Sequence, residues 1–414
     1  MQHSVSETDR ILSLDVVRGF ALLGILLLNI LGFGALFAMS INPTLGFSLP
    51  SDIWVWGAVE LTAEGAMRAL FSMLFGAGIL LFLGRGEGRG KLHFKRTFWL
   101  LIFGLFNGYI LMWPGDILST YALAGFFLYF LRNMSAKGLT ILSVVLFICL
   151  FAYGVAINFS LNYFQISAGQ SAEVAAEWDE FQKMIYPSDA ELSQELAQRT
   201  GSLKELFLWS ATEYSYMLLW VVPIFSFWET LVFMCIGMAF YRYGALQGAH
   251  SDRFYLLAAV AGFGVGLCIN SYEIYKMIAS DFDILASFPF FKPTYNLGRL
   301  AMAIGWIGLF ILAMRRFGIG QRLAAVGRMA LTNYVMQSLI CLFIFSGIGF
   351  GLLGVLRRTE LYLVVLLIWA FQLWLSPWWL ARYRYGPAEW LWRALTYGTA
   401  PQFARRRGTP NNQV

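Results

Sequence analysis

The polar residues with the clearest capacity for chemistry lie around a short turn, Trp113-Pro-Gly-Asp116, which joins two apolar segments. Asn107 precedes this turn and Tyr121 follows it. A carboxylate at the start of a helix can accept hydrogen bonds from the free N–H groups of the first helical turn. Ionisable groups within a membrane are costly to bury, however, and often mark a functional site. Two interpretations therefore stay open: Asp116 caps a helix, or Asp116 and Asn107 are catalytic in a pocket where Tyr121 contacts the substrate.

A second group of candidates lies in the apolar segment that begins near Leu14. Asp15 and Arg18 are three residues apart and are therefore neighbours on a helix. They predict either a local ion pair at the membrane face or a contact between Arg18 and an anionic ligand or lipid headgroup. Asn29 lies well inside the same segment, where a polar side chain must find a partner. Arg18 and Asn29 are therefore candidate substrate-binding residues.

The stretch Gly327–Ser338 carries several polar side chains within an otherwise apolar part of the chain. Arg328 lies at its start, and Asn333 and Gln337 follow within a few helical turns. Such side chains often join membrane helices by hydrogen bonds, and they can also line a cavity. Both interpretations stay open, and Arg328, Asn333 and Gln337 are candidates to contact a substrate.

The composition identifies the class of protein that must position these residues. Of the 414 residues, 58% are hydrophobic and 13% are charged, and the mean hydropathy is +0.63. Soluble domains carry about 25% charged residues, so the chain is predicted to be a membrane protein. Its 37 Phe and 15 Trp residues suit lipid and its interfaces. The net charge of +6 is not gathered into a basic and aromatic patch, so we expect membrane lipids as partners and no nucleic acid.

The cysteines do not form a recognisable motif. They lie singly in apolar segments, without the spacing of a metal or redox site. A free cysteine in such a segment behaves as a small hydrophobic residue. We therefore expect no metal site, and packing roles for Cys149, Cys235, Cys268 and Cys341.

Apolar segments of spanning length recur along the whole chain. A helix needs roughly 20 apolar residues to cross a bilayer, and the segments that fit are 16–37, 66–83, 95–113, 116–131, 139–161, 218–241, 254–275, 295–314, 329–354 and 361–380. Basic residues gather in alternate connections and in the C-terminal tail. Because positive loops face the cytoplasm, both termini are expected there, with the protein in a bacterial cytoplasmic (inner) membrane.

These segments predict an all-α polytopic fold of about ten transmembrane helices. Residues 1–162 form an N-terminal bundle and 218–382 a C-terminal membrane region, each with half of the spans. The acidic insertion 163–217 is expected on the outer side as short amphipathic helices. The tail 383–414 is basic and rich in Trp, and it predicts an amphipathic helix at the inner membrane surface.

Several motifs carry a resemblance to a known family. They are Leu14-Asp15…Arg18-Gly19…Asn29, Phe71…Leu74-Phe-Gly-Ala-Gly78, Trp113-Pro-Gly-Asp-Ile-Leu118, Gly327–Ser338 and Gly386–Tyr397. With these motifs the chain resembles the YeiB family, whose members carry a C-terminal domain of unknown function numbered 418. That family resembles the wider transmembrane acyltransferase superfamily, which moves acyl groups from a cytoplasmic donor to acceptors at or across the membrane.

The resemblance implies acyl-group handling, with acyl-CoA as the donor and a membrane lipid or envelope glycan as the acceptor. Basic residues of the inner face, among them Arg18 and Arg328, would then hold the donor phosphates. Many family members carry a histidine before the Trp…Gly-Asp turn, whereas this chain has Asn107, one position further away. Asparagine is not a general base at neutral pH, which leaves Asp116 as the candidate base. The open alternatives are a transporter or flippase of a small or lipid-linked substrate, and a non-catalytic membrane protein.

Overall fold

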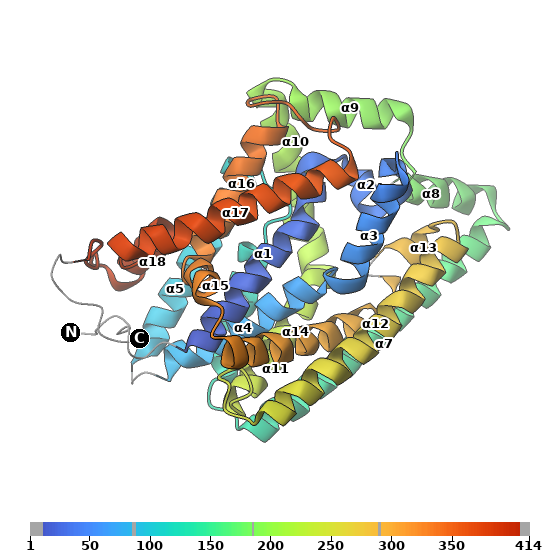
Figure 1. Ribbon diagram of the computed structural model, residues 1–414. Helices are drawn as coiled ribbons and strands as arrows, with labels where there is room; N and C mark the ends of the chain where they lie inside the picture. The colour runs from blue at the N-terminus through green and yellow to red at the C-terminus, as the bar shows by residue number, and fades with distance from the viewer. Residues whose placement is uncertain (1–10, 85–87, 184–185, 289–290, 406–414) are drawn as a thin grey trace.

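Helices make up the regular structure of the described part of the chain. The computed structural model describes residues 11–84, 88–183, 186–288 and 291–405. Within these ranges the chain forms helices from α1 to α18 and no β-strand (Figure 1). The predicted all-α fold is confirmed.

The first half of the chain contains the helices on both sides of the Asp116 turn. Their bounds are α1 (Leu12–Gly34), α2 (Phe37–Ile41), η2 (Pro43–Gly46), α3 (Pro50–Thr62), α4 (Ala66–Leu83), α5 (Arg89–Leu105), α6 (Leu118–Leu128), α7 (Ala136–Ala168), α8 (Ala172–Gln182) and α9 (Asp189–Thr200). A π-helical turn, η3 (Phe106–Ile110), extends α5, and a 3-10 turn, η4 (Tyr129–Leu131), extends α6. The predicted insertion, 163–217, contains the short helices α8 and α9.

The second half begins with a long, irregular apolar helix. The bounds are α10 (Leu203–Tyr216), η5 (Met217–Ser226), α11 (Phe227–Arg242), α12 (Asp252–Ala279), α13 (Ile284–Ser287), α14 (Tyr295–Phe317), α15 (Gln321–Arg328), α16 (Ala330–Phe345), α17 (Arg358–Arg382) and α18 (Pro387–Tyr397). The π-helical η5 joins α10 to α11 in one stretch, Leu203–Arg242. This stretch passes position 217, and α7 passes position 162, so these helices continue across both predicted limits of the insertion.

Seven described helical stretches are long and apolar enough to cross a membrane. The pair α15 and α16, bent by 80°, is an eighth candidate if both helices form one broken span. The predicted spans 95–113 and 116–131 correspond to the shorter helices α5 and α6, on either side of the Asp116 turn. The polytopic membrane fold is confirmed, with seven to eight long apolar helices among the described residues.

Paired glycines allow two helix pairs to pack backbone against backbone. Between α4 and α11, a Cβ added at Gly76 would lie 2.1 Å from the Met234 carbonyl oxygen, and one added at Gly237 would lie 1.9 Å from that of Met73. Small residues permit such close approach in membrane helices. The same arrangement joins α1 to α15 through Gly19 and Gly327, which places the N-terminal segment against the polar stretch of the C-terminal half.

Two groups of helices lie at opposite ends of the molecule. α18, α5 and α15 lie at one end, whereas α2, α3, α8, α9 and α13 lie at the other (Figure 1). The predicted interfacial helix in the tail is α18, which packs on α5 through a 2.8 Å hydrogen bond from Trp392 Nε1 to the Arg96 carbonyl oxygen. This contact joins the C-terminal tail to the N-terminal half of the chain.

Candidate functional site

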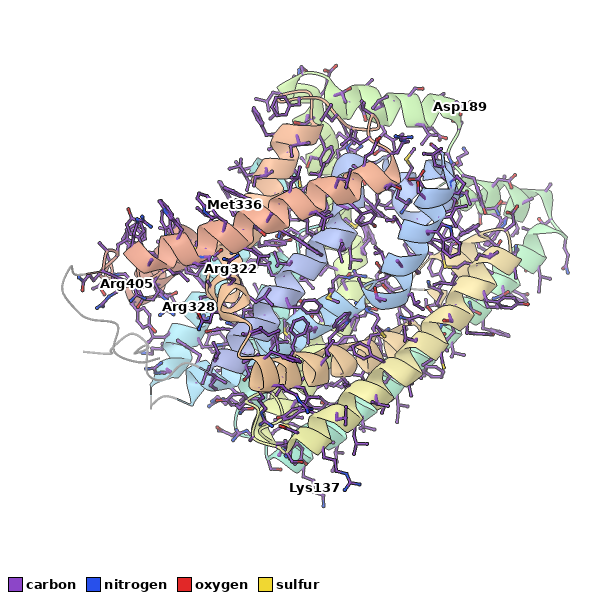
Figure 2. The ribbon with its side chains drawn as sticks, in the orientation of Figure 1. Lys137, Asp189, Arg322, Arg328, Met336 and Arg405 are labelled. Atoms are coloured by element: carbon purple, nitrogen blue, oxygen red, sulfur yellow. The ribbon has the colours of Figure 1, made fainter. Side chains whose placement is uncertain are left out.

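A cavity of about 260 Å³ lies where α1, α4, α5, α6, α15, α16 and α18 meet. Four arginines from four different helices line it: Arg18 of α1, Arg96 of α5, Arg328 of α15 and Arg393 of α18. Figure 2 shows Arg328 at one end of α15 and Arg322 elsewhere on the same helix. Since sequence separation between these arginines reaches hundreds of residues, only the fold brings them together.

One wall of this arginine-rimmed cavity is apolar. It is formed by side chains of α4, α5 and α6, namely Phe71, Leu74, Phe75, Leu100 and Leu118. An apolar wall beside several cations suits a ligand with an anionic head and a hydrocarbon part, because each part meets a matching surface. The cavity therefore has the polarity expected of a site for an anionic amphiphile.

Aromatic rings hold two of the arginines in place. The Arg96 guanidinium lies 4.2 Å from the Trp392 ring centroid and 4.8 Å from that of Phe82. The Arg393 guanidinium lies 4.6 Å from the Tyr385 ring centroid. Guanidinium groups over aromatic faces are attracted by the ring quadrupole, and these contacts restrict the rotation of both side chains. These cations are therefore oriented before any ligand arrives.

Two carboxylates also line the cavity, and each has a local partner. Asp15 accepts a 2.9 Å hydrogen bond from Arg18, which is the ion pair that the spacing allowed. Glu389 accepts from the backbone N–H of Leu331 at 2.7 Å and from the Thr332 hydroxyl at 2.5 Å, at the start of α16. Burial raises the pKa of the Glu389 carboxyl above its ordinary value, while the Thr332 hydrogen bonds oppose the rise. Among the described residues that line the cavity, four arginines therefore stand against two carboxylates.

His93 lines the same cavity and is 2% exposed. Its Nε2 lies 2.9 Å from the Gly125 carbonyl oxygen. Because a carbonyl oxygen only accepts, Nε2 must carry the hydrogen, and in the neutral ring Nδ1 is then the basic nitrogen. His93 is not among the site residues predicted from the sequence, although its spacing to Arg96, Thr97 and Leu100 places all four on one helical face.

Asp116 and Asn107 lie together, but outside the residues that line the cavity. Asp116 Oδ1 accepts from Asn107 Nδ2 at 3.0 Å, and Asp116 Oδ2 accepts from the backbone N–H of Ser119 at 2.9 Å. Both side chains are buried. The contact with Ser119, in the first turn of α6, is the capping interaction that one of the two interpretations required.

A tyrosine connects the Asp116 turn to the cavity. Tyr334 lines the cavity, and its hydroxyl oxygen accepts from the backbone N–H of Ile117 at 3.1 Å. On the other side of the turn, the hydroxyls of Ser119 and Tyr214 are 2.6 Å apart. Asp116 therefore lies behind the cavity wall, in a hydrogen-bond network that joins α6 to α10 and α16.

The other predicted residues divide between the cavity and helix interfaces. Tyr121 lines the cavity, with its hydroxyl 2.7 Å from the Ser72 hydroxyl. Asn333 donates to Ser376 at 3.0 Å and Gln337 donates to Gln372 at 3.0 Å, so both join α16 to α17.

Asn29 is partly buried on α1 and, like the α16 amides, is not among the cavity-lining residues. Of the predicted site residues, the cavity thus brings together Arg18, Tyr121 and Arg328. Among the described residues, no group of three or more His, Cys, Asp or Glu side chains is placed to hold a metal ion.

The fold and this cavity define a multi-pass membrane protein, and comparison with known proteins identifies its family. Residues 240–399 match the model of a protein family of unknown function, DUF418. The chain is 31% identical over 398 residues to the uncharacterized protein YeiB of Escherichia coli (strain K12), covering 95% of this chain and 97% of YeiB. It is 30% identical to the uncharacterized protein YxaH of Bacillus subtilis (strain 168), covering 94% of each chain. The chain belongs to the YeiB family. No solved structure matches it.

Proposed function

We propose that this chain is an acyltransferase of the bacterial cytoplasmic membrane. It takes an acyl group from a cytoplasmic acyl-CoA and passes it to a hydroxyl of a membrane lipid or envelope glycan. The observation that carries the proposal is the arginine-rimmed cavity, which combines four guanidinium groups with an apolar wall. An acyl-CoA has the same combination of a multiply charged phosphate part and a hydrocarbon part.

The cations supply the recognition of the donor. Guanidinium groups form strong, often bidentate hydrogen bonds with phosphate oxygens. Arg96 and Arg393, which stack on aromatic rings, lose little conformational freedom when they bind. The acyl chain then lies against Phe71, Leu74 and Phe75, where each buried CH₂ contributes about 0.8 kcal/mol.

His93 is the proposed general base. The acceptor hydroxyl oxygen attacks the thioester carbonyl carbon, its proton moves to His93 Nδ1, and the C–S bond breaks. The proton then passes from His93 to the departing thiolate, so the products are an oxygen ester and CoA thiol. Gly125, which accepts from Nε2, holds the ring in the tautomer that this step needs. Asp116 acts as a positioning residue behind Tyr334 and Ile117.

The orientation that fits this reaction places the cavity mouth at the cytoplasmic face, with both chain termini on that side. The basic connections at 132–137 and 242–253 support this orientation by the positive-inside rule. The acidic helices α8 and α9 then lie on the outer side. A cytoplasmic donor would enter between Arg18 and Arg328 without crossing the membrane.

Turnover of an acyl-CoA by the purified chain tests the proposal. The full chain is placed in liposomes made with total lipid and glycan extract of its host, and ¹⁴C-octanoyl-CoA is added outside. Thiol release and label in the extracted lipid or glycan are measured. The matched variant is His93→Gln, because a glutamine amide can still donate to Gly125 while it removes the base.

We expect thiol release with stoichiometric labelling of an acceptor in the wild type. The rate should fall about 10²- to 10⁴-fold in His93→Gln at unchanged melting temperature. Absence of thiol release in the wild type would refute acyl transfer. Movement of intact label across the membrane without thioester cleavage would select the transporter instead.

A further inference from the structure

A buried lysine at the end of the molecule opposite the cavity is shared by two carboxylates. Lys292 Nζ lies 3.4 Å from Glu60 Oε1 on α3 and 3.6 Å from Glu273 Oε2 on α12. The exposed fractions of these side chains are 6% for Lys292, 17% for Glu60 and 8% for Glu273. The Thr294 hydroxyl donates to Glu273 at 2.7 Å. We call Glu60, Glu273 and Lys292 the Lys292 site.

The charged groups of α4, α11 and α14 that surround this site are paired one to one. Arg68 lies 3.4 Å from Glu64, which occupies the break between α3 and α4, and the Tyr295 hydroxyl donates to the same carboxylate. Arg299 Nη1 lies 2.9 Å from Glu229 Oε1, and both side chains are buried. These two ion pairs are electrically balanced and leave no cation for the Lys292 site.

On the remaining side, α17 contributes one cation, Arg358, and α3 contributes one further carboxylate, Asp52. The charge of Arg358 interacts with those of Asp52 and Glu60 on α3. Asp52 also accepts hydrogen bonds from the N–H and the hydroxyl of Thr359, at 2.9 Å and 2.7 Å, which stabilise its ionised form. Tyr362, hydrogen-bonded to Arg358, is an ordinary neutral phenol at pH 7. The Lys292 site therefore keeps two carboxylates against one ammonium.

An excess of one negative charge is energetically unfavourable inside a membrane protein. An ionised carboxylate without a matching cation carries a large desolvation penalty when buried, and two carboxylates beside each other repel. Binding one proton removes both costs, because the site then holds one carboxylate, one ammonium and one neutral acid. We propose that Glu60 and Glu273 share one bound proton beside Lys292, so that the Lys292 site is a proton-binding site. Glu60 is the more exposed of the two carboxylates.

This site is separate from the proposed acyl transfer. In that reaction the proton of the acceptor hydroxyl ends on the thiolate, so no net proton is taken up or released. The Lys292 site also shares no residue with the arginine-rimmed cavity. Failure of either proposal therefore leaves the other standing.

Infrared spectroscopy of the full chain in lipid nanodiscs detects such a proton directly. A protonated carboxyl group has a C=O stretch distinct from that of a carboxylate, and it shifts in D₂O. The spectrum is recorded between pH 5 and pH 9, with either NaCl or choline chloride as the salt. The variants are Glu60→Gln, Glu273→Gln and Lys292→Met, with Glu173→Gln on the exposed face of α8 as control.

We expect one protonated carboxyl per chain at pH 7 in the wild type and in Glu173→Gln. Either glutamine substitution at the Lys292 site should abolish that band, because the remaining charges then balance. Lys292→Met should instead increase it. A wild-type spectrum without a protonated carboxyl at pH 7 would overturn the proposal whether or not the variants fold. So would a band that sodium abolishes but choline does not, since the site would then bind a metal cation.

Discussion

At the scale of single residues, Asp116 is surrounded by donors. Its two oxygens accept from Asn107 Nδ2 and from the Ser119 N–H, and the Leu118 N–H and the Ser119 hydroxyl add further hydrogen bonds. A carboxylate is an acceptor only, so it suits both partners at once. An asparagine at position 116 has only one acceptor oxygen. Its NH₂ group would therefore face one of the two donors, where no hydrogen bond can form. Asp116→Asn therefore requires one of the neighbouring groups to reorient.

We predict that Asp116→Ala costs about 2–3 kcal/mol of unfolding free energy, because it leaves two buried donors without an acceptor. Asp116→Asn should cost only about 1 kcal/mol. The Asn107 amide can turn over and present its Oδ1, which has no partner in the described structure, to the new NH₂ group. Denaturant unfolding of both variants in detergent measures these values. Equal losses for the two substitutions would contradict the proposed rearrangement.

Some site residues could be predicted from the sequence because their polarity contrasts with their surroundings. Arg18, Tyr121 and Arg328 are polar residues in or beside apolar segments, and all three line the cavity. His93 and Arg393 could not be predicted in this way, since they lie in segments that are polar or interfacial in any case. Their roles depend on the docking of α18 against α5, which is a tertiary contact without a local sequence signal.

At the scale of helices, the contact between α4 and α11 depends on two glycines. Gly76→Ala would place a methyl group against the Met234 backbone and should cost about 1–3 kcal/mol or prevent folding. Gly78→Ala is the matched control on the same helix, because no atom lies within 4 Å of its added Cβ. Its higher helix propensity should leave stability unchanged or raise it by up to about 1 kcal/mol. Thermal melting of the two variants distinguishes them; a stable Gly76→Ala protein would contradict the packing.

The existence of most helices could be predicted from the sequence, but their breaks could not. Apolar length located the spans, because a bilayer demands about 20 apolar residues. The 80° bend between α15 and α16 and the π-helical η5 around Pro223 have no counterpart in the predicted spans. Hydropathy averages over a window and does not register where the backbone turns, so the bend that brings Arg328 to the cavity was not anticipated.

At the scale of the whole molecule, we predict that both chain termini lie on the cytoplasmic side of the membrane. Reporter fusions after residues 250 and 320 should report the cytoplasm, because both positions lie beside basic connections. A fusion at residue 180, within the acidic α8, should report the outer side. A cytoplasmic signal at 180 would contradict the orientation and would place the cavity mouth away from the acyl-CoA pool.

We propose that the arginine-rimmed cavity binds an acyl thioester, and equilibrium binding of octanoyl-CoA to the purified chain tests this most directly. Arg328→Ala should weaken binding by about tenfold or more, as expected for a lost charge-assisted hydrogen bond to phosphate. Arg322→Ala, the exposed control on the same helix and outside the cavity lining, should leave the dissociation constant unchanged. Equal affinity of the wild type and Arg328→Ala, or no measurable binding by the wild type, would contradict the account.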